Sequence, residues 1–423
     1  MESSHPPGAL LPFDVSKHYS DRANNMTASE IRELLKVTQR PGMISFAGGL
    51  PNPDTFPVEI VKGIVDQVLS EHGAEALQYG STEGMARLRN LLWEKHARED
   101  GANENDSVIL SNGVQQGLDL LSKVTINQGD AVVLEAPSYL TGGMAFRVYG
   151  CDIYSVDLDD GGIRIDLLEE TLSGLRRQGR TPKFLYLTPT FHNPAGVTMD
   201  LKRRHQVMDL AYEFDLLVVE DDPYHMLNYD GIEVRNLKSM DEDNRVLYYS
   251  SFSKILSPGL RLGYAIGPSD LIQKMVLAKQ TADLCTNTLS QFIAYEYLAG
   301  GHLDAHIDTI LRIYRTKRDL MLQSLSDYMP DGVQWTRPAG GMFLWATFPE
   351  VVDTRAMFPR SAARNVAYVH GRSFYFDGRG AHQARLNFSH AADEKIVEGI
   401  QALGEVTAEE IELAKREPKK VVA

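Results

Sequence analysis

Between two apolar runs, 246–249 and 262–266, the chain reads Ser250-Ser251-Phe252-Ser253-Lys254-Ile255-Leu256-Ser257-Pro258-Gly259-Leu260-Arg261. Both runs have the apolar character expected of strands that are buried on both faces of a sheet. A single lysine is usually a surface charge. Here, however, hydroxyl groups, a lysine, a Pro-Gly turn and an arginine converge between two buried strands, which indicates a polar site at the edge of that sheet.

The same alternation of short and long apolar patterns extends outward from this segment over residues 107–268. Longer amphipathic stretches separate the short runs, and one of them, 201–214, places Val207, Leu210 and Phe214 at helical spacing. This alternation predicts an α/β fold with a mostly parallel sheet covered by helices. The further strand-like runs are 108–110, 131–135, 153–156, 184–187 and 216–219.

After residue 299 the pattern changes to that of a smaller α+β unit. A long charged helical stretch, 307–328, precedes shorter runs at 342–348, 366–369 and 384–388. At about 150 residues per domain, a chain of 423 residues predicts two or three units. We expect an N-terminal arm and helix associated with the small domain, a large domain and a small C-terminal domain, spanning 1–55, 56–298 and 299–423.

Composition and net charge indicate which binding partners and which cellular compartment suit the protein. Lys and Arg number 43 against 57 Asp and Glu, a net charge of −14, and no basic block offsets it, which disfavours nucleic acid and anionic membranes as partners. The two cysteines, Cys151 and Cys285, exclude a disulfide framework and favour a reducing, cytoplasmic compartment. The N-terminus lacks a signal-peptide pattern, and no run approaches the roughly 18 apolar residues of a spanning helix.

Three other polar segments also follow strand-like runs directly, where the ligand of a parallel sheet lies. Residues 111–117 open a helix whose free N–H groups could hold a phosphate, although a glycine before a helix is also a common turn. Residues 188–196 contain an Asn-Pro turn. Residues 220–224 begin with three carboxylates, which are costly to bury unless a cation is near; the alternative is a solvated loop.

In this order, the four segments resemble the pyridoxal-5′-phosphate (PLP) aminotransferases of fold type I, class I/II. The resemblance looks closest to the 2-aminoadipate and kynurenine aminotransferase branch, and it runs from 31–35 and 45–51 to 385–389. Its strongest element is the spacing of 28 residues from Asn193 to Asp221 and of 33 from Asp221 to Lys254. It implies a large PLP-binding domain with a mostly parallel sheet and a smaller α+β domain.

The resemblance also implies cofactor-binding roles for named residues. Lys254 would form a Schiff base with the PLP aldehyde and then move the proton between substrate and cofactor. Asp221 would face the pyridine nitrogen and keep it protonated, so that the ring acts as an electron sink. Tyr224 and Asn193 would share the ring O3′, and Tyr139 would stack on the ring. The phosphate would be held by Gly113, Val114, Gln115, Ser251, Ser253 and Arg261.

For the substrate, the resemblance places Arg385 on the α-carboxylate with help from Asn193, and Gly49 nearby. Arg32, on a short N-terminal helix, would pair with a distal carboxylate or else be an exposed helical arginine. Tyr79 matches a tyrosine that reaches the phosphate of the partner subunit, which implies a homodimer with shared active sites. The expected reaction moves the amino group of an L-amino acid to a 2-oxo acid, with 2-oxoglutarate as the expected acceptor and no metal.

Three positions depart from the family pattern. Val114 stands where the phosphate loop usually carries serine, Ala195 replaces a threonine and His370 replaces a proline. If His370 or His225 pointed into the site, it could act as a further acid or base. This possibility leaves open a second reading, another PLP enzyme on the same fold that catalyses β/γ-elimination, replacement or carbon–carbon bond formation in secondary metabolism.

Two further readings carry less weight. His302 and His306 have the i,i+4 spacing of a metal pair, but two ligands are too few and Leu303 stands where a zinc hydrolase needs glutamate, so a solvated helix start is favoured. The aminotransferase-like sensor domain of certain transcription regulators would need a DNA-binding module. The roughly thirty residues that precede Ile31 are too few for such a module, and a net charge of −14 disfavours DNA binding, so we do not expect a transcription regulator.

Overall fold

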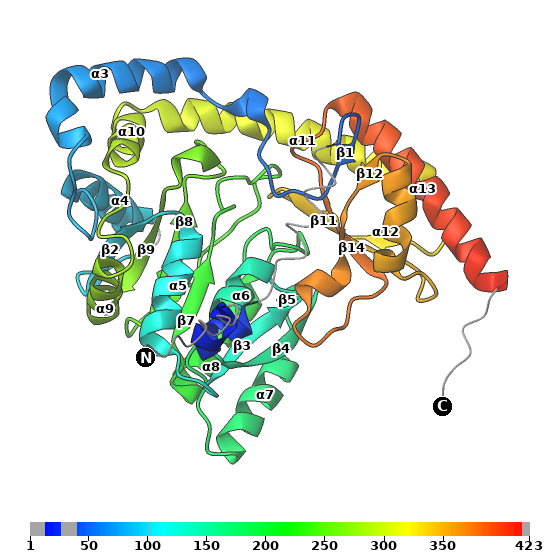
Figure 1. Ribbon diagram of the computed structural model, residues 1–423, viewed down its shortest axis with the longest axis horizontal. Coiled ribbons are helices and arrows are strands. Elements are labelled where there is room, and N and C mark those ends of the chain that lie inside the picture. Colours follow the sequence, from blue (N-terminus) through cyan, green and yellow to red (C-terminus); the bar gives the residue numbers. More distant parts are fainter. Residues whose placement is uncertain (1–12, 27–39, 100, 417–423) are drawn as a thin grey trace, which may run out of the picture.

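The computed structural model describes residues 13–26, 40–99 and 101–416 (Figure 1). Its largest sheet has eight strands in the order β2-β9-β8-β7-β6-β3-β4-β5. The pairs from β8 through β7, β6 and β3 to β4 are parallel, whereas β9 is antiparallel to both of its neighbours. The α/β class with a mostly parallel sheet is therefore confirmed. The strands are β2 (Asp106–Ser111), β3 (Ala131–Ala136), β4 (Asp152–Asp159), β5 (Gly162–Ile163), β6 (Leu185–Leu187), β7 (Val218–Asp221), β8 (Val246–Ser251) and β9 (Gly263–Pro268).

Helices cover both faces of this sheet because alternate strand residues point to opposite sides. In β3, Val132 and Leu134 face a core that includes residues of α5 (Val114–Thr125), α6 (Leu140–Arg147) and α9 (Ser269–Gln280). Ala131 and Val133 face a second core with residues of α7 (Ile165–Arg177) and α8 (Leu201–Phe214). β3 is thus buried on both faces, as its apolar run predicts.

A second, antiparallel sheet of four strands has the order β10-β11-β14-β13. The long helix α11 (His302–Tyr328) leads from α10 toward it and packs against α13 (Asp393–Arg416), as Figure 1 shows. β1 (Ile44–Ser45) pairs with β12 (Val366–Ala367), which brings an N-terminal segment to the C-terminal part of the chain. The domain boundaries stay predictions. The remaining strands are β10 (Gln334–Trp335), β11 (Phe343–Thr347), β13 (Val369–His370) and β14 (Gln383–Asn387).

The other helices lie around these two sheets. Among the described residues, no helix is both long enough and apolar enough to cross a bilayer. The remaining α-helices are α1 (Asp21–Asn25), α3 (Val58–Ala76), α4 (Ala86–Glu99), α10 (Thr288–Ala299) and α12 (Thr354–Ala363). The short 3-10 turns are η1 (Val15–His18), η2 (Pro53–Thr55), η3 (Lys238–Met240), η4 (Pro258–Leu260) and η5 (Gly371–Phe374).

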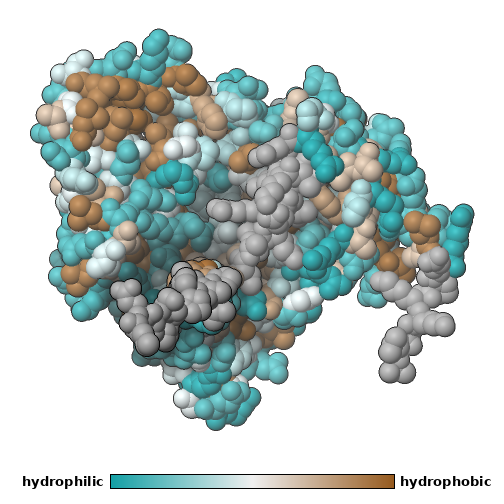
Figure 2. All heavy atoms as spheres, viewed as in Figure 1, coloured by the Kyte–Doolittle hydropathy of each residue, from teal (hydrophilic) through white to brown (hydrophobic). Residues whose placement is uncertain are grey.

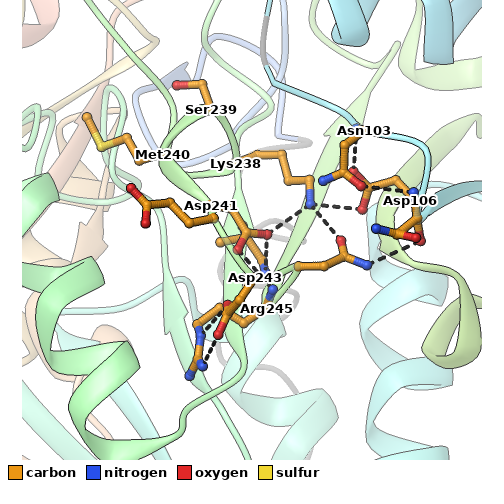
Figure 3. Close-up of polar contacts among 12 residues, drawn as sticks. Asn103, Asp106, Lys238, Ser239, Met240, Asp241, Asp243 and Arg245 are labelled. Atoms are coloured by element: carbon orange, nitrogen blue, oxygen red, sulfur yellow. Dashed lines mark hydrogen bonds and ion pairs between the residues drawn. The ribbon is translucent and has the colours of Figure 1, made fainter.

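A buried lysine anchors the connection between β7 and β8 (Figure 3). Lys238 is 1% exposed, and its Nζ lies 2.8 Å from Oδ1 of Asp106 and 2.9 Å from Oδ2 of Asp241. It also donates to Oδ1 of Asn244 at 3.2 Å. Because Asp106 begins β2 and this connection leads into β8, the lysine joins the amino ends of two strands, away from the edge where the polar segments lie.

We expect Lys238→Met to lower the free energy of unfolding by about 3–5 kcal/mol, because two buried carboxylates would lose their cation. Equilibrium urea denaturation followed by circular dichroism measures this change. Lys202→Met, at an exposed position on α8, is the matched control and should leave the midpoint nearly unchanged. A loss below about 1 kcal/mol for Lys238→Met would show that the carboxylates find other partners.

Candidate active site

A cavity of about 380 Å³ lies at the carboxyl ends of β7 and β8, where the polar segments of the sequence converge. It is lined by the predicted residues Gly49, Val114, Gln115, Tyr139, Asn193, Asp221, Tyr224, Ser251, Ser253, Lys254, Arg261 and Arg385. Parallel strands end at the same edge of a sheet, which is why segments far apart in the chain meet here. Sequence reasoning missed several lining residues, namely Leu50, Pro51, Thr141, Thr188, Pro223, Pro258 and Phe343.

Lys254 follows β8 and lies in this cavity. Its Nζ donates a hydrogen bond to the carbonyl oxygen of Gly49 at 2.7 Å. Burial, together with the smaller effect of the nearby guanidinium groups of Arg385 and Arg261, lowers the pKa of the Lys254 amine to about 8. A substantial fraction of the amine is therefore neutral near neutral pH, and the neutral amine is the form that can act as a nucleophile or accept a proton.

Asp221, the last residue of β7, is buried and offers an unused acceptor. Its Oδ2 accepts a hydrogen bond from the Tyr186 hydroxyl at 2.6 Å, whereas Oδ1 has no hydrogen-bond partner among the described residues. Burial raises the pKa of the Asp221 carboxyl to about 7; the bond from Tyr186 opposes this shift and the neighbouring Asp222 adds to it. A buried acceptor without a donor is costly, so the cavity wall is built to meet an N–H group or a cation.

Another part of the cavity suits an anion. Gly113 has φ +79° and precedes α5, and a Cβ there would lie 2.5 Å from Nη2 of Arg261, so only glycine lets the guanidinium approach the helix start. Ser251 and Ser253 hydroxyls lie 2.8 Å apart beside it. Free N–H groups at a helix start, together with hydroxyls and a guanidinium, match the chemistry of a phosphate. Val114 can contribute only its backbone.

Arg385, on β14, presents a second cation to the cavity. Its Nη1 donates to Oδ1 of Asn193 at 2.9 Å and its Nη2 donates to the Ala47 carbonyl at 2.6 Å. The guanidinium lies 4.3 Å from the ring centre of Phe343 and 5.0 Å from that of Phe374. No carboxylate pairs with it within the described part of the chain, and burial lowers the pKa of Arg385 to about 10. A carboxylate ligand would relieve this cost.

A pair of buried residues that sequence reasoning also missed holds the loop that carries Asn193. Oε2 of Glu135 accepts a hydrogen bond from the Thr188 N–H at 2.7 Å and lies 3.3 Å from Nε2 of His192. Nδ1 of His192 accepts from the Ala195 N–H at 3.1 Å. Two features of the sequence could have indicated this pair: Glu135 is an acidic residue at the end of an apolar run, and His192 stands beside the Asn-Pro turn. For Tyr186, the only signal was a tyrosine within an apolar run.

Other predicted residues lie elsewhere. Tyr79 is 78% exposed and does not line the cavity, and Arg32 falls outside the described residues. His370 is buried beside Ser373, and His225 faces Asp222 in a different cavity. Neither histidine lines the candidate site, so the idea that one supplies an acid or base there lacks geometric support.

The structure also corrects the expected surroundings of His306 and of the three carboxylates at 220–222. His306 does not belong to a solvated helix start, because it is buried and contacts the Tyr297 hydroxyl and the Thr55 carbonyl. Over the described ranges, no group of three metal-ligating side chains occurs. The three carboxylates from Glu220 to Asp222 are buried and do not form a solvated loop.

A doubly covered, largely parallel sheet with a partly buried lysine, Lys254, and two arginines in one cavity at its carboxyl edge defines a transferase of fold type I. Residues 43–403 match the family described as aminotransferase class I and II, and the chain belongs to this family. The predicted family and enzyme class are thereby confirmed.

Individual relatives agree with this assignment. The chain is 48% identical to an aromatic-amino-acid aminotransferase of Thermococcus litoralis, over 94% of this chain and 96% of the relative. It is 40% identical to a 2-aminoadipate transaminase of Thermus thermophilus, over 93% and 98%. Among solved structures, the kynurenine aminotransferase of Pyrococcus horikoshii in complex with PMP is 44% identical, with a TM-score of 0.92 and coverage of 94% and 98%. The predicted branch is confirmed, and nothing here favours elimination or carbon–carbon bond formation.

Proposed function

We propose that this aminotransferase binds PLP in the cavity at the carboxyl ends of β7 and β8 and transfers the amino group of an L-amino acid to 2-oxoglutarate. The observation that carries the proposal is the Oδ1 of Asp221, which has no partner in the described part of the chain, in the same cavity as the Lys254 amine and the anion-binding groups around Arg261. These three features match the ring nitrogen, the aldehyde and the phosphate of one molecule. PLP supplies an aldehyde that accepts amino groups and a ring that withdraws electrons from the substrate Cα.

The residues of the chain then have distinct tasks. Lys254 takes and returns a proton at the substrate Cα, a task that suits an amine whose pKa of about 8 lies near neutrality. Asp221 accepts a hydrogen bond from the ring nitrogen. Tyr224, which accepts a hydrogen bond from the Asn193 amide at 3.3 Å, donates with it to the ring oxygen, and Tyr139 packs on the ring. Backbone groups of Gly113, Val114 and Gln115, with Ser251, Ser253 and Arg261, bind the phosphate.

On the substrate side, Arg385 and Asn193 bind the α-carboxylate close to Gly49. Arg32 stays a candidate for a distal carboxylate. Because relatives are named for aromatic amino acids, 2-aminoadipate and kynurenine, these donors lead the list for this enzyme. We also place the protein in the cytoplasm, since Cys151 and Cys285 are both free thiols, which suits a reducing compartment.

A panel of amino donors with 2-oxoglutarate, analysed by mass spectrometry, tests the function. We expect each active donor to yield its own 2-oxo acid together with an equal amount of glutamate. With donor alone, the bound PLP should convert to pyridoxamine phosphate. If ammonia were released and no donor in the panel produced pyridoxamine phosphate, amino transfer would be contradicted.

We further infer a homodimer with shared active sites. Figure 2 shows a large hydrophobic surface at the upper left, over α3 and α10. Exposed apolar residues of this part of the chain include Val58, Leu69 and Leu77, and Tyr79 lies just beyond them in sequence. A surface of this kind is typical of an interface. It would allow Tyr79 to reach the phosphate site of the partner subunit.

We expect Tyr79→Phe to raise the Kd for PLP roughly tenfold, because one hydrogen bond to a charged phosphate would be lost. Fluorescence titration of the cofactor-free enzyme measures this change, and sedimentation velocity shows whether the dimer persists. Tyr328→Phe, an exposed tyrosine on α11, should leave the Kd unchanged. Equal Kd values for Tyr79→Phe and the unaltered protein would remove Tyr79 from the site.

A further inference from the structure

A second cavity of about 310 Å³ adjoins the candidate active site and shares Pro223 and Ser251 with it. Asp222 and His225 both line this second cavity, and neither lines the first. Consecutive residues at the end of a strand point to opposite sides. Asp221 therefore faces the active-site cavity while Asp222, directly after it, faces the second one.

The surroundings of Asp222 differ from those of an ordinary surface carboxylate. Its side chain is fully buried, and its Oδ2 lies 3.3 Å from Nδ1 of His225 and accepts a hydrogen bond from the Tyr248 hydroxyl at 3.3 Å. Its Oδ1 has no hydrogen-bond partner among the described residues. The side chain of His225 is 33% exposed, so its ring reaches solvent, whereas the side chain of Asp222 does not.

Other titratable and charged groups surround this pair on several elements. Glu220 and Asp221 are its neighbours on the chain. Arg204, on α8, lies 3.8 Å from Glu220 and also interacts electrostatically with Asp222; its charge does not change near neutral pH. His96, Lys95 and Glu99 of α4 and Tyr264 of β9 line the same cavity, with His96 bonded to Tyr264 at 2.9 Å. Lys95 is paired with Glu99 at 2.5 Å. Of these groups, His225 is the one in direct contact with the Asp222 carboxylate that can change its charge near neutral pH.

We propose that Asp222 is a positioning residue whose negative charge, directly behind Asp221, keeps a proton on the pair formed by Asp221 and the cofactor ring nitrogen, and that His225 offsets this charge when it is protonated. The inference rests on the proposed role of Asp221. Neither residue contacts the cofactor cavity, so both act through Asp221. The raised pKa of Asp221, to which burial contributes most and Asp222 in part, agrees with this arrangement.

The expected changes follow from charge alone. Asp222→Asn removes the negative charge, and His225→Lys places a permanent positive charge beside it, so both variants should make the ring nitrogen lose its proton at lower pH. We expect a downward shift of about one pH unit for each. His225→Gln should leave an alkaline transition in place, because His225 is already neutral there.

The experiment loads each variant with PLP labelled with 15N at the ring nitrogen and follows its chemical shift by NMR as a function of pH. His205→Lys, at an exposed position on α8, is the charge-matched control and should show no shift. Transitions of Asp222→Asn and His225→Lys that coincide with that of the unaltered enzyme, or an upward shift in His225→Lys, would overturn the proposal. His225→Lys alters a partly exposed position, so the test stands even if Asp222→Asn folds poorly.

Failure of this inference can be told apart from failure of the proposed function. Borohydride reduction followed by peptide mass analysis reports whether PLP is bound to Lys254 in each variant. Normal attachment with an unshifted ring-nitrogen transition refutes only the role of Asp222 and His225. Absence of attachment in the unaltered protein refutes the proposed function.

Discussion

Lys254→Ala is expected to lower kcat for amino transfer by at least about 10⁴-fold, the largest single effect predicted for this chain. Under the proposed function, the variant would lose both the amine that attaches to the cofactor and the group that moves the proton at the substrate Cα. Among the residues that the structure describes, no other lysine lines the cavity to replace it. Steady-state kinetics with the best donor measure the loss, and borohydride reduction with peptide mapping should find no modified peptide at position 254.

Lys274→Ala, on the exposed side of α9, is the matched control and should keep full activity. Retained turnover together with a reducible linkage in Lys254→Ala would contradict the assignment. The pKa of about 8 adds a second check, because only the neutral amine reacts with the aldehyde. Below pH 8 the rate of PLP attachment to the cofactor-free enzyme should rise about tenfold per pH unit, and above pH 8 it should level off.

Arg385→Gln is expected to lower kcat/KM by about 30-fold to 4000-fold, which corresponds to the 2–5 kcal/mol typical of breaking a buried hydrogen-bonded charge pair. Arg385→Lys should recover only part of this, because an ammonium cannot form the two parallel bonds of a guanidinium with a carboxylate. Its contacts with Asn193 and Ala47 and its place between two phenyl rings also depend on the planar group.

The substrate itself provides the sharpest control for Arg385. An amine that has the donor's side chain but lacks the α-carboxylate should react equally slowly with the unaltered enzyme and with Arg385→Gln. Arg337→Lys, at an exposed position, should leave all constants unchanged. A similar loss with the amine and with the amino acid would mean that Arg385 supports the fold of the site and does not bind the carboxylate.

Much of the fold follows from local patterns in the chain. Strands that are buried on both faces are apolar along most of their length, and apolar, β-branched runs located seven strands of the large sheet, although β4 is only partly buried. Each polar group of the predicted site directly follows such a run or lies in a recognisable motif. Parallel connectivity then brings these strand ends to one edge. Asp221, Lys254 and Arg261 are placed in this way.

Residues that act through contacts between distant parts of the chain could not be located from these patterns. Tyr186 reads as an ordinary core residue of β6 until its hydroxyl is found 2.6 Å from Asp221. Asp222 reads as one of the three carboxylates of residues 220–224, and His225 as a candidate acid or base of the site, yet both line a second cavity. His306 reads as a helix-start residue, although the packing of α11 buries it against Tyr297.

The alternation of apolar runs was enough to predict the sheet, and the order and spacing of Asn193, Asp221 and Lys254 carried the resemblance to the family. Both are properties of the chain as a sequence. Tertiary packing alone decided which side of its strand each buried charge faces. It also decided which neighbours shift the pKa of that group. Burial and Coulomb interactions depend on distances in space, and residues far apart in sequence set those distances.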